Sequence, residues 1–339
     1  MKKIFLFGLL SLMGLTAFEQ SITDVKLRSD ENGRGKLKKA PRKIFIAEFR
    51  VMYQLLYVAE DTKKGSVFDG GMTGDVTVAL AMGLQGITED DLIQNTNHLY
   101  SSFTQRMKDA GYEMVTAGAM AGIKEFKDWE RKKGGGLSDV QFKGFVMSTP
   151  TDFEYFVKGT RADGREKKTF TDNSAKISYQ SDNITVVKVN LVVPIAENGE
   201  SWTSGAFKLG GAKVVAETAL KLSDEMITGK GFGNSISTMA NFVNSEAMSL
   251  PTSLCYYSLK KPVEINEVLE KKKFKVTGSS DYDWSGTQMG VYKVFTVQNQ
   301  FLKKVIPLPV EAAKYNAGVR MAGDAFLKEA WDSFAGNAN

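Results

Sequence analysis

Apolar and polar residues alternate over a long stretch in the middle of the chain, residues 182–197, which read DNITVVKVNLVVPIAE. A period of two predicts a β-strand, because successive side chains of a strand point to opposite faces. One face is almost wholly apolar: Thr185, Val187, Val189, Leu191, Val193 and Ile195. The other face is mixed: Ile184, Val186, Lys188, Asn190, Val192 and Pro194. This pattern is typical of a central strand whose second face is only partly covered, and the following Asn198-Gly199 predicts a turn.

A second alternating stretch, residues 44–59, predicts a long neighbouring strand. One of its faces is expected to carry Phe45, Ala47, Phe49, Val51, Tyr53, Leu55, Tyr57 and Ala59. The other is expected to carry Ile44, Ile46, Glu48, Arg50, Met52 and Gln54. Shorter strands are expected at residues 76–82, 112–117, 142–149, 153–158 and 290–298, and at 214–222, where the spacing also fits a helix.

Apolar residues three and four apart predict helices elsewhere. Thr88, followed by three acidic residues, is typical of a helix start; the apolar stripe then runs over residues 92–110 and Gly111 marks the end. The clearest stripe covers residues 310–334. Helices are also expected at residues 119–132, at 263–269 and just after Ser235. Pro307 and Pro309 are expected to break the chain, and the polar residues 159–173 to form an exposed loop.

These elements predict an α/β (α+β) fold with a mixed β-sheet, long central strands, two or three packed helices and a C-terminal α+β extension. The expected organisation is a signal peptide at 1–17, a solvated polar leader arm at 18–42, an α/β domain at 43–225 and the extension at 226–339.

The first residues have the features of a secretory signal peptide: basic Lys2 and Lys3, an apolar stretch at 4–15 and a tolerable cleavage site after Ala17. An uncleaved N-terminal anchor is the alternative. No other stretch approaches the ~18 apolar residues of a transmembrane segment. Cleavage after Ala17 would remove Lys2 and Lys3 and lower the net charge of the chain from +5 to +3 (5 − 2). This positive charge is too small to indicate nucleic-acid binding.

The chain has one cysteine, Cys255, and one histidine, His98. Cys255 lies in an apolar run and is expected to be buried, and His98 lies at the edge of a helical stripe. The common zinc sites and an internal disulfide framework are therefore excluded, and a Cys–His nucleophile pair is improbable. No catalytic constellation and no cofactor are predicted.

Candidate binding residues lie in loops. Asp281, Asp283 and Ser285, followed by Gly286, match the first half of a calcium-binding loop, but Tyr292 stands where a bidentate Glu belongs. We therefore expect no metal there and interpret the segment as a polar hairpin tip. Its aromatic residues, Tyr282 and Trp284, are candidate contacts for a protein partner.

The order of elements over residues 43–225 resembles bacterial envelope α/β domains of the TolB N-terminal and CsgG (curli secretion) kind. The residues that carry the resemblance are 43–49 (KIFIAEF), the helix at 92–110, the strand at 112–116, the next helix, residues 142–146 (FKGFV), and the strand 186–195 with its turn at 198–202. The chain lacks the family's lipidated cysteine. The resemblance implies an envelope protein that acts by assembly or by binding partners.

The sequence therefore predicts a non-catalytic, exported cell-envelope protein, periplasmic or peripheral to the outer membrane. It would serve as an interaction or assembly subunit, for instance of an outer-membrane secretion or surface-assembly complex, with protein partners and no nucleic acid. One alternative is a periplasmic small-ligand-binding protein that uses the glycine loops at residues 70–74 and 229–233. The other is a periplasmic hydrolase with paired carboxylates, whose residues the sequence cannot pair.

Overall fold

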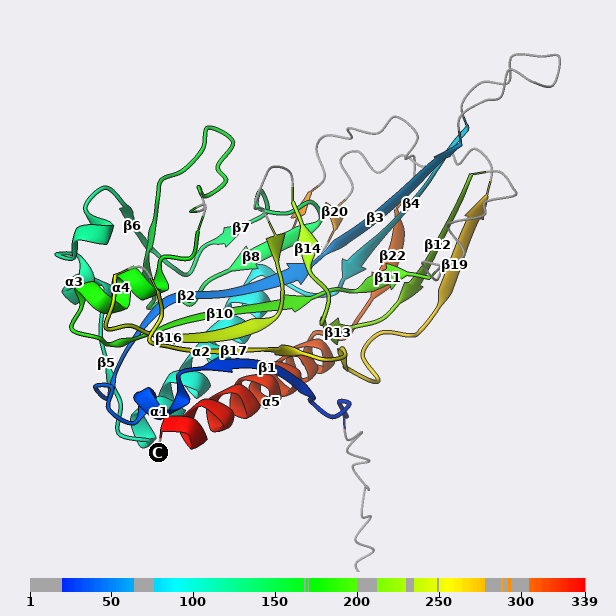
Figure 1. Cartoon of the computed structure of the whole chain (residues 1–339). Helices are drawn as coiled ribbons and strands as arrows, with labels where there is room; N and C mark the ends of the chain where they lie inside the picture. The colour runs from blue at the N-terminus through cyan, green and yellow to red at the C-terminus, as the bar shows by residue number, and fades with distance from the viewer. Residues whose placement is uncertain are drawn as a thin grey trace, which may run out of the picture.

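The computed structural model describes residues 20–63, 76–167, 169, 171–199, 212–229, 235–248, 250–277, 288–289, 292–293 and 305–338. Mixed sheets and helices confirm the predicted α/β class (Figure 1). The helices are α1 (Arg34–Leu37), α2 (Glu89–Asp109), α3 (Ala117–Met120), the 3-10 helix η1 (Lys124–Phe126), α4 (Ser174–Gln180) and α5 (Ala312–Ala338). Among the described residues, no helix is both long and apolar enough to cross a membrane.

An eight-stranded sheet forms the body of the molecule, in the order β1-β17-β16-β10-β2-β8-β7, with β5 also paired to β2. The bounds are β1 (Leu27–Asn32), β2 (Lys43–Gln54), β5 (Glu113–Met114), β7 (Leu137–Ser138), β8 (Phe145–Ser148), β10 (Thr185–Val193), β16 (Met239–Asn244) and β17 (Ser253–Leu259). The two long predicted strands are neighbours, because β10 pairs with β2 in parallel. Strands β16 and β17, from the C-terminal third, complete the same sheet.

A β-bulge changes the predicted faces of β2. Val187 pairs with Ile46 and Lys188 with Glu48, so Ala47 is an extra residue. Because an extra residue reverses the alternation, Ile44 and Ile46 share the main core with Phe49, while Phe45 lies in a different cluster. The expected grouping of Phe45 with Phe49 is therefore wrong. The predicted faces of β10 are confirmed: its apolar face belongs to the main core.

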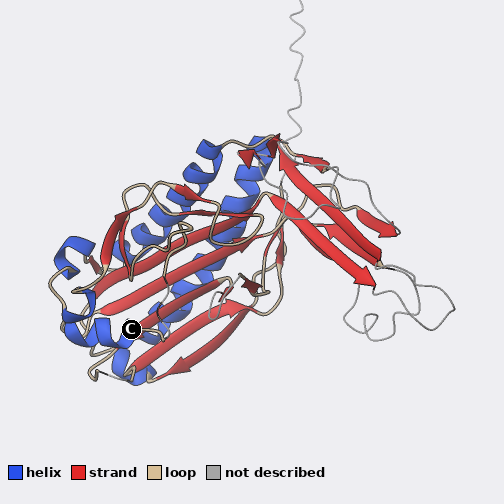
Figure 2. Cartoon of the chain, turned by 90° about the horizontal axis from the view of Figure 1, so that it is seen from above, coloured by secondary structure: helices blue, strands red, loops and turns tan. Residues whose placement is uncertain are grey.

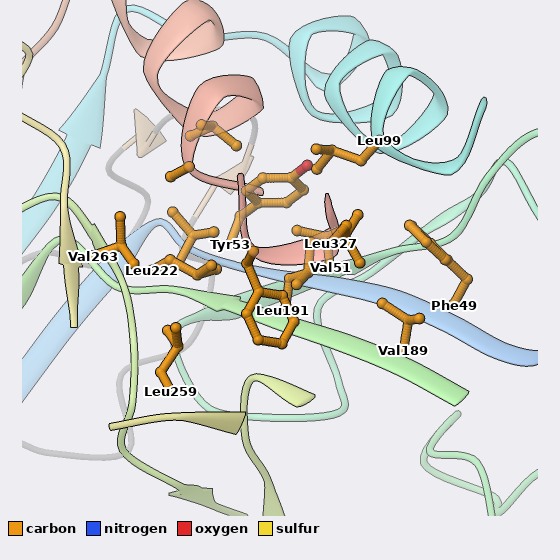
Figure 3. Close-up of a cluster of buried hydrophobic side chains, with 14 of the residues drawn as sticks. Phe49, Val51, Tyr53, Leu99, Val189, Leu191, Leu222, Leu259, Val263 and Leu327 are labelled. Atoms are coloured by element: carbon orange, nitrogen blue, oxygen red, sulfur yellow. The ribbon is translucent and has the colours of Figure 1, made fainter. Parts of the chain in front are cut away.

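Helices α2 and α5 cover one face of the sheet. In Figure 1, α5 runs along one side of the strands, and the segments with β6 and β14 lie on the other. Figure 3 shows Val51 and Tyr53 of β2 facing Leu99 of α2 and Leu327 of α5. Helix α2 starts with the predicted cap: Thr88 and Asp91 form a capping box. Gly111, with φ of 82°, ends it as expected.

Both long strands break at the same level, and a second group of strands begins there. Strand β2 ends at Gln54 and β3 (Leu56–Lys63) follows; β10 ends before Pro194, which has no N–H to donate. Figures 1 and 2 show this second group projecting away from the body. It contains two three-stranded sheets, β22-β4-β3 and β11-β12-β19. Their other bounds are β4 (Val76–Gln85), β22 (Ile306–Pro309), β11 (Ala196–Asn198), β12 (Lys213–Thr218) and β19 (Lys273–Thr277).

Short strand pairs complete the described structure: β6 (Glu130–Lys133) with β9 (Glu154–Val157), β13 (Lys221–Leu222) with β18 (Val263–Glu264), β14 (Ile227–Thr228) with β15 (Ser235–Ile236), and β20 (Gln288–Met289) with β21 (Tyr292–Lys293). Pro307 and Pro309 do not break the chain but lie in β22. That strand is at a sheet edge, where proline is tolerated.

Three predicted helices are wrong. Residues 119–132 form the end of α3, then η1 and part of β6; a glycine in mid-helix, here Gly122, costs about 1 kcal/mol. Residues after Ser235 form β16, which is buried on both faces and so shows no clean two-residue period. In residues 263–269, Glu267 has φ of 63°, which cannot continue a right-handed helix.

The leader arm is also not a free solvated segment. Residues 27–32 form β1, which pairs with β17 at the sheet edge, and Leu37 of α1 is buried. Most side chains of β1 are exposed, which explains the polar composition, because native edge strands carry charged residues.

Candidate functional site

A cleft of about 310 Å³ opens over the middle of the sheet face that α2 and α5 do not cover. Its floor comes from three strands, with Glu48 and Arg50 on β2, Lys188 and Asn190 on β10, and Met239 on β16. Its walls are Phe126, Trp129, Phe156, Val157, Glu166, Lys167, Thr169, Thr171, Asp172, Asn173, Ile177 and Ser235.

Two apolar clusters flank this polar floor on the same face of the sheet. One contains Phe45 and Val186, covered by residues of α3, η1 and α4. The other contains Met52 and Val192 with residues of β8. Alternation therefore brings the polar residues of β2 and β10 together as a band between two apolar regions.

Arg50 is the centre of a buried ionic cluster. Its guanidinium lies 2.9 Å from Glu166 and 3.5 Å from Glu48. Burial disfavours the charged guanidinium, but Glu48 and Glu166 outweigh this effect and raise the pKa of Arg50. Glu166 also accepts a hydrogen bond of 2.8 Å from the Tyr155 hydroxyl and lies 3.5 Å from the Lys132 ammonium.

Glu166 and Asn173 correct the prediction for residues 159–173. The segment was expected to be an exposed loop, and its tip is exposed, but both of these residues are buried. An isolated bridge between Thr160 and Glu166 folds the segment back. The Glu166 carboxylate can be buried because it is paired with Arg50.

Asp172 forms the second ionic group of the cleft. Its carboxylate accepts hydrogen bonds from Lys188 at 2.6 Å and from the backbone N–H and hydroxyl of Ser174 at 3.0 and 2.7 Å. The Asn241 amide donates to it at 3.4 Å. Burial opposes ionisation of Asp172, but Lys188 and the bonds from Ser174 outweigh it and lower the pKa below its ordinary value.

Aromatic rings line the wall nearest to α3 and η1. Phe126 and Phe156 stack with their ring centroids 4.0 Å apart. Trp129 meets Phe126 edge to face at 5.3 Å. Trp129 and Phe156 remain partly exposed, so they present apolar ring surface to the cleft.

Buried polar atoms on this floor have no hydrogen-bond partner within the described part of the chain. They include Arg50 Nε and Asn190 Oδ1, and beside them Asn241 Oδ1. The side chains are nearly inaccessible, with exposed fractions of 8%, 4% and 6%. Each such atom costs about 1–3 kcal/mol relative to a satisfied one.

His98 and Cys255 take no part in this cleft. His98, on α2, is half-exposed and lies 2.7 Å from Asp324 of α5. Cys255 is buried, as predicted, on the helix-covered face of the sheet, and burial raises the pKa of its thiol. Among the described residues, no group of three or more His, Cys, Asp and Glu side chains could hold a metal ion.

The binding residues proposed from the sequence are almost all outside the described structure. Tyr282, Trp284, Asp281, Asp283 and Ser285 fall outside the described residues, as does the loop at 70–74; of residues 229–233 only Gly229 is described. Sequence reasoning missed the cleft. The available signal was the interruption of two apolar strands by Glu48, Arg50, Lys188 and Asn190 at similar positions.

Comparisons with protein-family models, curated proteins and solved structures found no match to this chain.

Proposed function

We propose that this protein is a non-catalytic binding protein and that the cleft over β2 and β10 is where it binds a small ligand. The observation that carries this proposal is the set of buried polar atoms without partners on the cleft floor. Small-molecule sites are concave and combine apolar walls with a few polar groups that fix the ligand's orientation. The cleft has both features.

The carboxylates of the cleft favour binding over hydrolysis. Glu48, Glu166 and Asp172 each lie against a cation. A hydrolase with paired carboxylates needs one carboxyl that stays protonated through a raised pKa, whereas the pKa of Asp172 is lowered. Asp172 therefore does not supply that acid. It pairs with Lys188, and Glu48 and Glu166 pair with Arg50.

Ligand-observed NMR against a mixed library of sugars, polyols, amino acids and nucleosides tests the proposal. Ser235 lines the cleft, so Ser235→Trp should fill it and abolish the signals of bound compounds. Met226, which is exposed and outside the cleft lining, provides the control. Met226→Trp should bind as the unaltered protein does. Signals that survive Ser235→Trp would place binding elsewhere.

We also propose that the protein acts in the cell envelope after removal of residues 1–17. The support is the arrangement of Lys2, Lys3 and the apolar stretch before Ala17. Cell fractionation with N-terminal sequencing should find a mature chain that begins at Phe18 outside the cytoplasm. An intact Met1 on the envelope-associated protein would favour an uncleaved anchor.

A role as an assembly subunit at the outer membrane rests on the resemblance to TolB- and CsgG-type domains. The order of β2, α2, β5, β8 and β10 supports it, but a helix at residues 119–132, which the resemblance includes, does not form. Crosslinking in native membranes, followed by capture and mass spectrometry, should recover a defined complex. A strictly monomeric protein after mild extraction would count against this role.

A further inference from the structure

The two buried, unpartnered atoms at the cleft floor differ in what they need from a ligand group, which would have to both donate and accept hydrogen bonds. Arg50 Nε can only donate and Asn190 Oδ1 can only accept. The two residues are direct partners in the β2–β10 register, so their backbones are about 4.8 Å apart. A hydroxyl group can accept from one and donate to the other, and so can a pair of adjacent hydroxyls.

The charges of the cleft are already balanced. Its lining contains three carboxylates, Glu48, Glu166 and Asp172, and three cations, Arg50, Lys167 and Lys188. Arg50 and Lys188 lie against carboxylates at 2.9 and 2.6 Å. Lys167 is exposed, so on the cleft floor an anionic ligand would meet these carboxylates and a cationic one would meet the paired cations. On the floor, either would lose its hydration without a new ion pair in return. A neutral ligand avoids this cost.

The aromatic wall and the size of the cleft narrow the chemical class of the ligand further. Partly exposed Trp129 and Phe156 offer apolar surface, against which the C–H face of a saccharide ring can pack while its hydroxyls reach the floor. A volume of about 310 Å³ corresponds to roughly ten water molecules at ~30 Å³ each, which suits one or two sugar rings.

We propose that the cleft binds a neutral, hydroxyl-rich ligand of the monosaccharide or disaccharide class. This inference rests on the proposed function of the cleft as a binding site. Arg50 Nε–H and Asn190 Oδ1 hold adjacent hydroxyls of the ligand, and the Trp129–Phe156 wall packs against its ring.

Thermal unfolding of the full chain with defined probes tests the class. The neutral probes are glucose, galactose, mannose, N-acetylglucosamine and maltose. The charged probes are glucuronate, glucosamine and the zwitterions alanine and dialanine. All probes are used at 10 mM. Sugars also raise unfolding midpoints by exclusion from protein surfaces, so each shift is compared with that of Asn190→Leu, which experiences the same exclusion. Gln105→Leu, on the exposed side of α2, is the matched control.

We expect at least one neutral sugar to raise the midpoint of the unaltered protein and of Gln105→Leu by about 4 °C at a hundred times its Kd. Asn190→Leu should bind that sugar at least about tenfold more weakly, because one hydrogen bond is lost. If only charged probes raise the midpoint of the unaltered protein more than that of Asn190→Leu, the ligand is not a neutral sugar, but the cleft still binds a ligand. No Asn190-dependent shift with any probe would also overturn the class. The binding function itself fails if, in addition, Asn190→Leu is less stable than the unaltered protein, because Asn190 is then structural.

Discussion

The two faces of the main sheet are built differently although they share the same strands. On the face covered by α2 and α5, residues such as Phe49, Val189 and Phe242 are fully buried in one apolar core. On the opposite face, apolar clusters occupy the two ends and a polar band lies between them. If apolar residues replaced this polar band, the two clusters would join and no buried polar atom would be left without a partner there. We therefore propose that the first face provides stability and that the polar band serves ligand binding.

The largest effect is expected on the helix-covered face. Phe242 is inaccessible and stacks on Phe334 of α5 with ring centroids 4.3 Å apart. Phe242→Ala should lower the free energy of unfolding by about 3–5 kcal/mol, since it removes a buried ring and leaves a cavity. Urea denaturation measures this change. A loss below about 1 kcal/mol would show that this face is not the stabilising one.

The next effect concerns the ionic cluster of the cleft. Glu166→Gln leaves Arg50 and Lys132 without their shared carboxylate, and breaking a buried ion pair from one side costs about 3 kcal/mol or more. Arg50 then keeps only Glu48, at 3.5 Å. Arg50→Met combined with Glu48→Gln and Glu166→Gln should be more stable than Glu166→Gln alone, because no charge of the Arg50 cluster is then left short of its partner. Urea denaturation measures the free energy of unfolding of each variant. The explanation would be contradicted if the combined variant were no more stable than Glu166→Gln, or if its loss equalled the sum of the losses of the single substitutions.

Much of the sheet and of both long helices follows from the sequence, and the cleft does not. The period of β10, the Thr88 cap and the stripe of α5 are local signals, and each is confirmed. The bulge at Ala47 leaves no such signal, because Ile44 and Phe45 are both apolar and either fits the core. Glu166 meets Arg50 across 116 positions of sequence, and no periodicity reports a contact of that range.

The smallest effect should appear in the pH dependence of stability. The pKa of Asp172 is lower in the folded chain than its ordinary value of about 3.9. Its stabilisation is therefore present above that value and is lost as the pH falls through the folded pKa. Asp172 is half-exposed, so Asp172→Asn should cost only about 0.5 kcal/mol at neutral pH. The difference between the two proteins should shrink below about pH 4. Chemical denaturation from pH 3 to 7 measures it, and a difference that grows in acid would reverse the assignment.

The free energy of unfolding of Asn190→Leu tests most directly whether the polar band is kept for binding. Asn190 is buried, and its Oδ1 has no partner among the described residues. Leucine has a similar shape and no polar atom to satisfy. We expect the free energy of unfolding without ligand to stay unchanged or to rise by up to about 1–2 kcal/mol. A loss of more than about 1 kcal/mol would show that Asn190 supports the fold, and the contrast between the two faces would no longer indicate a binding site.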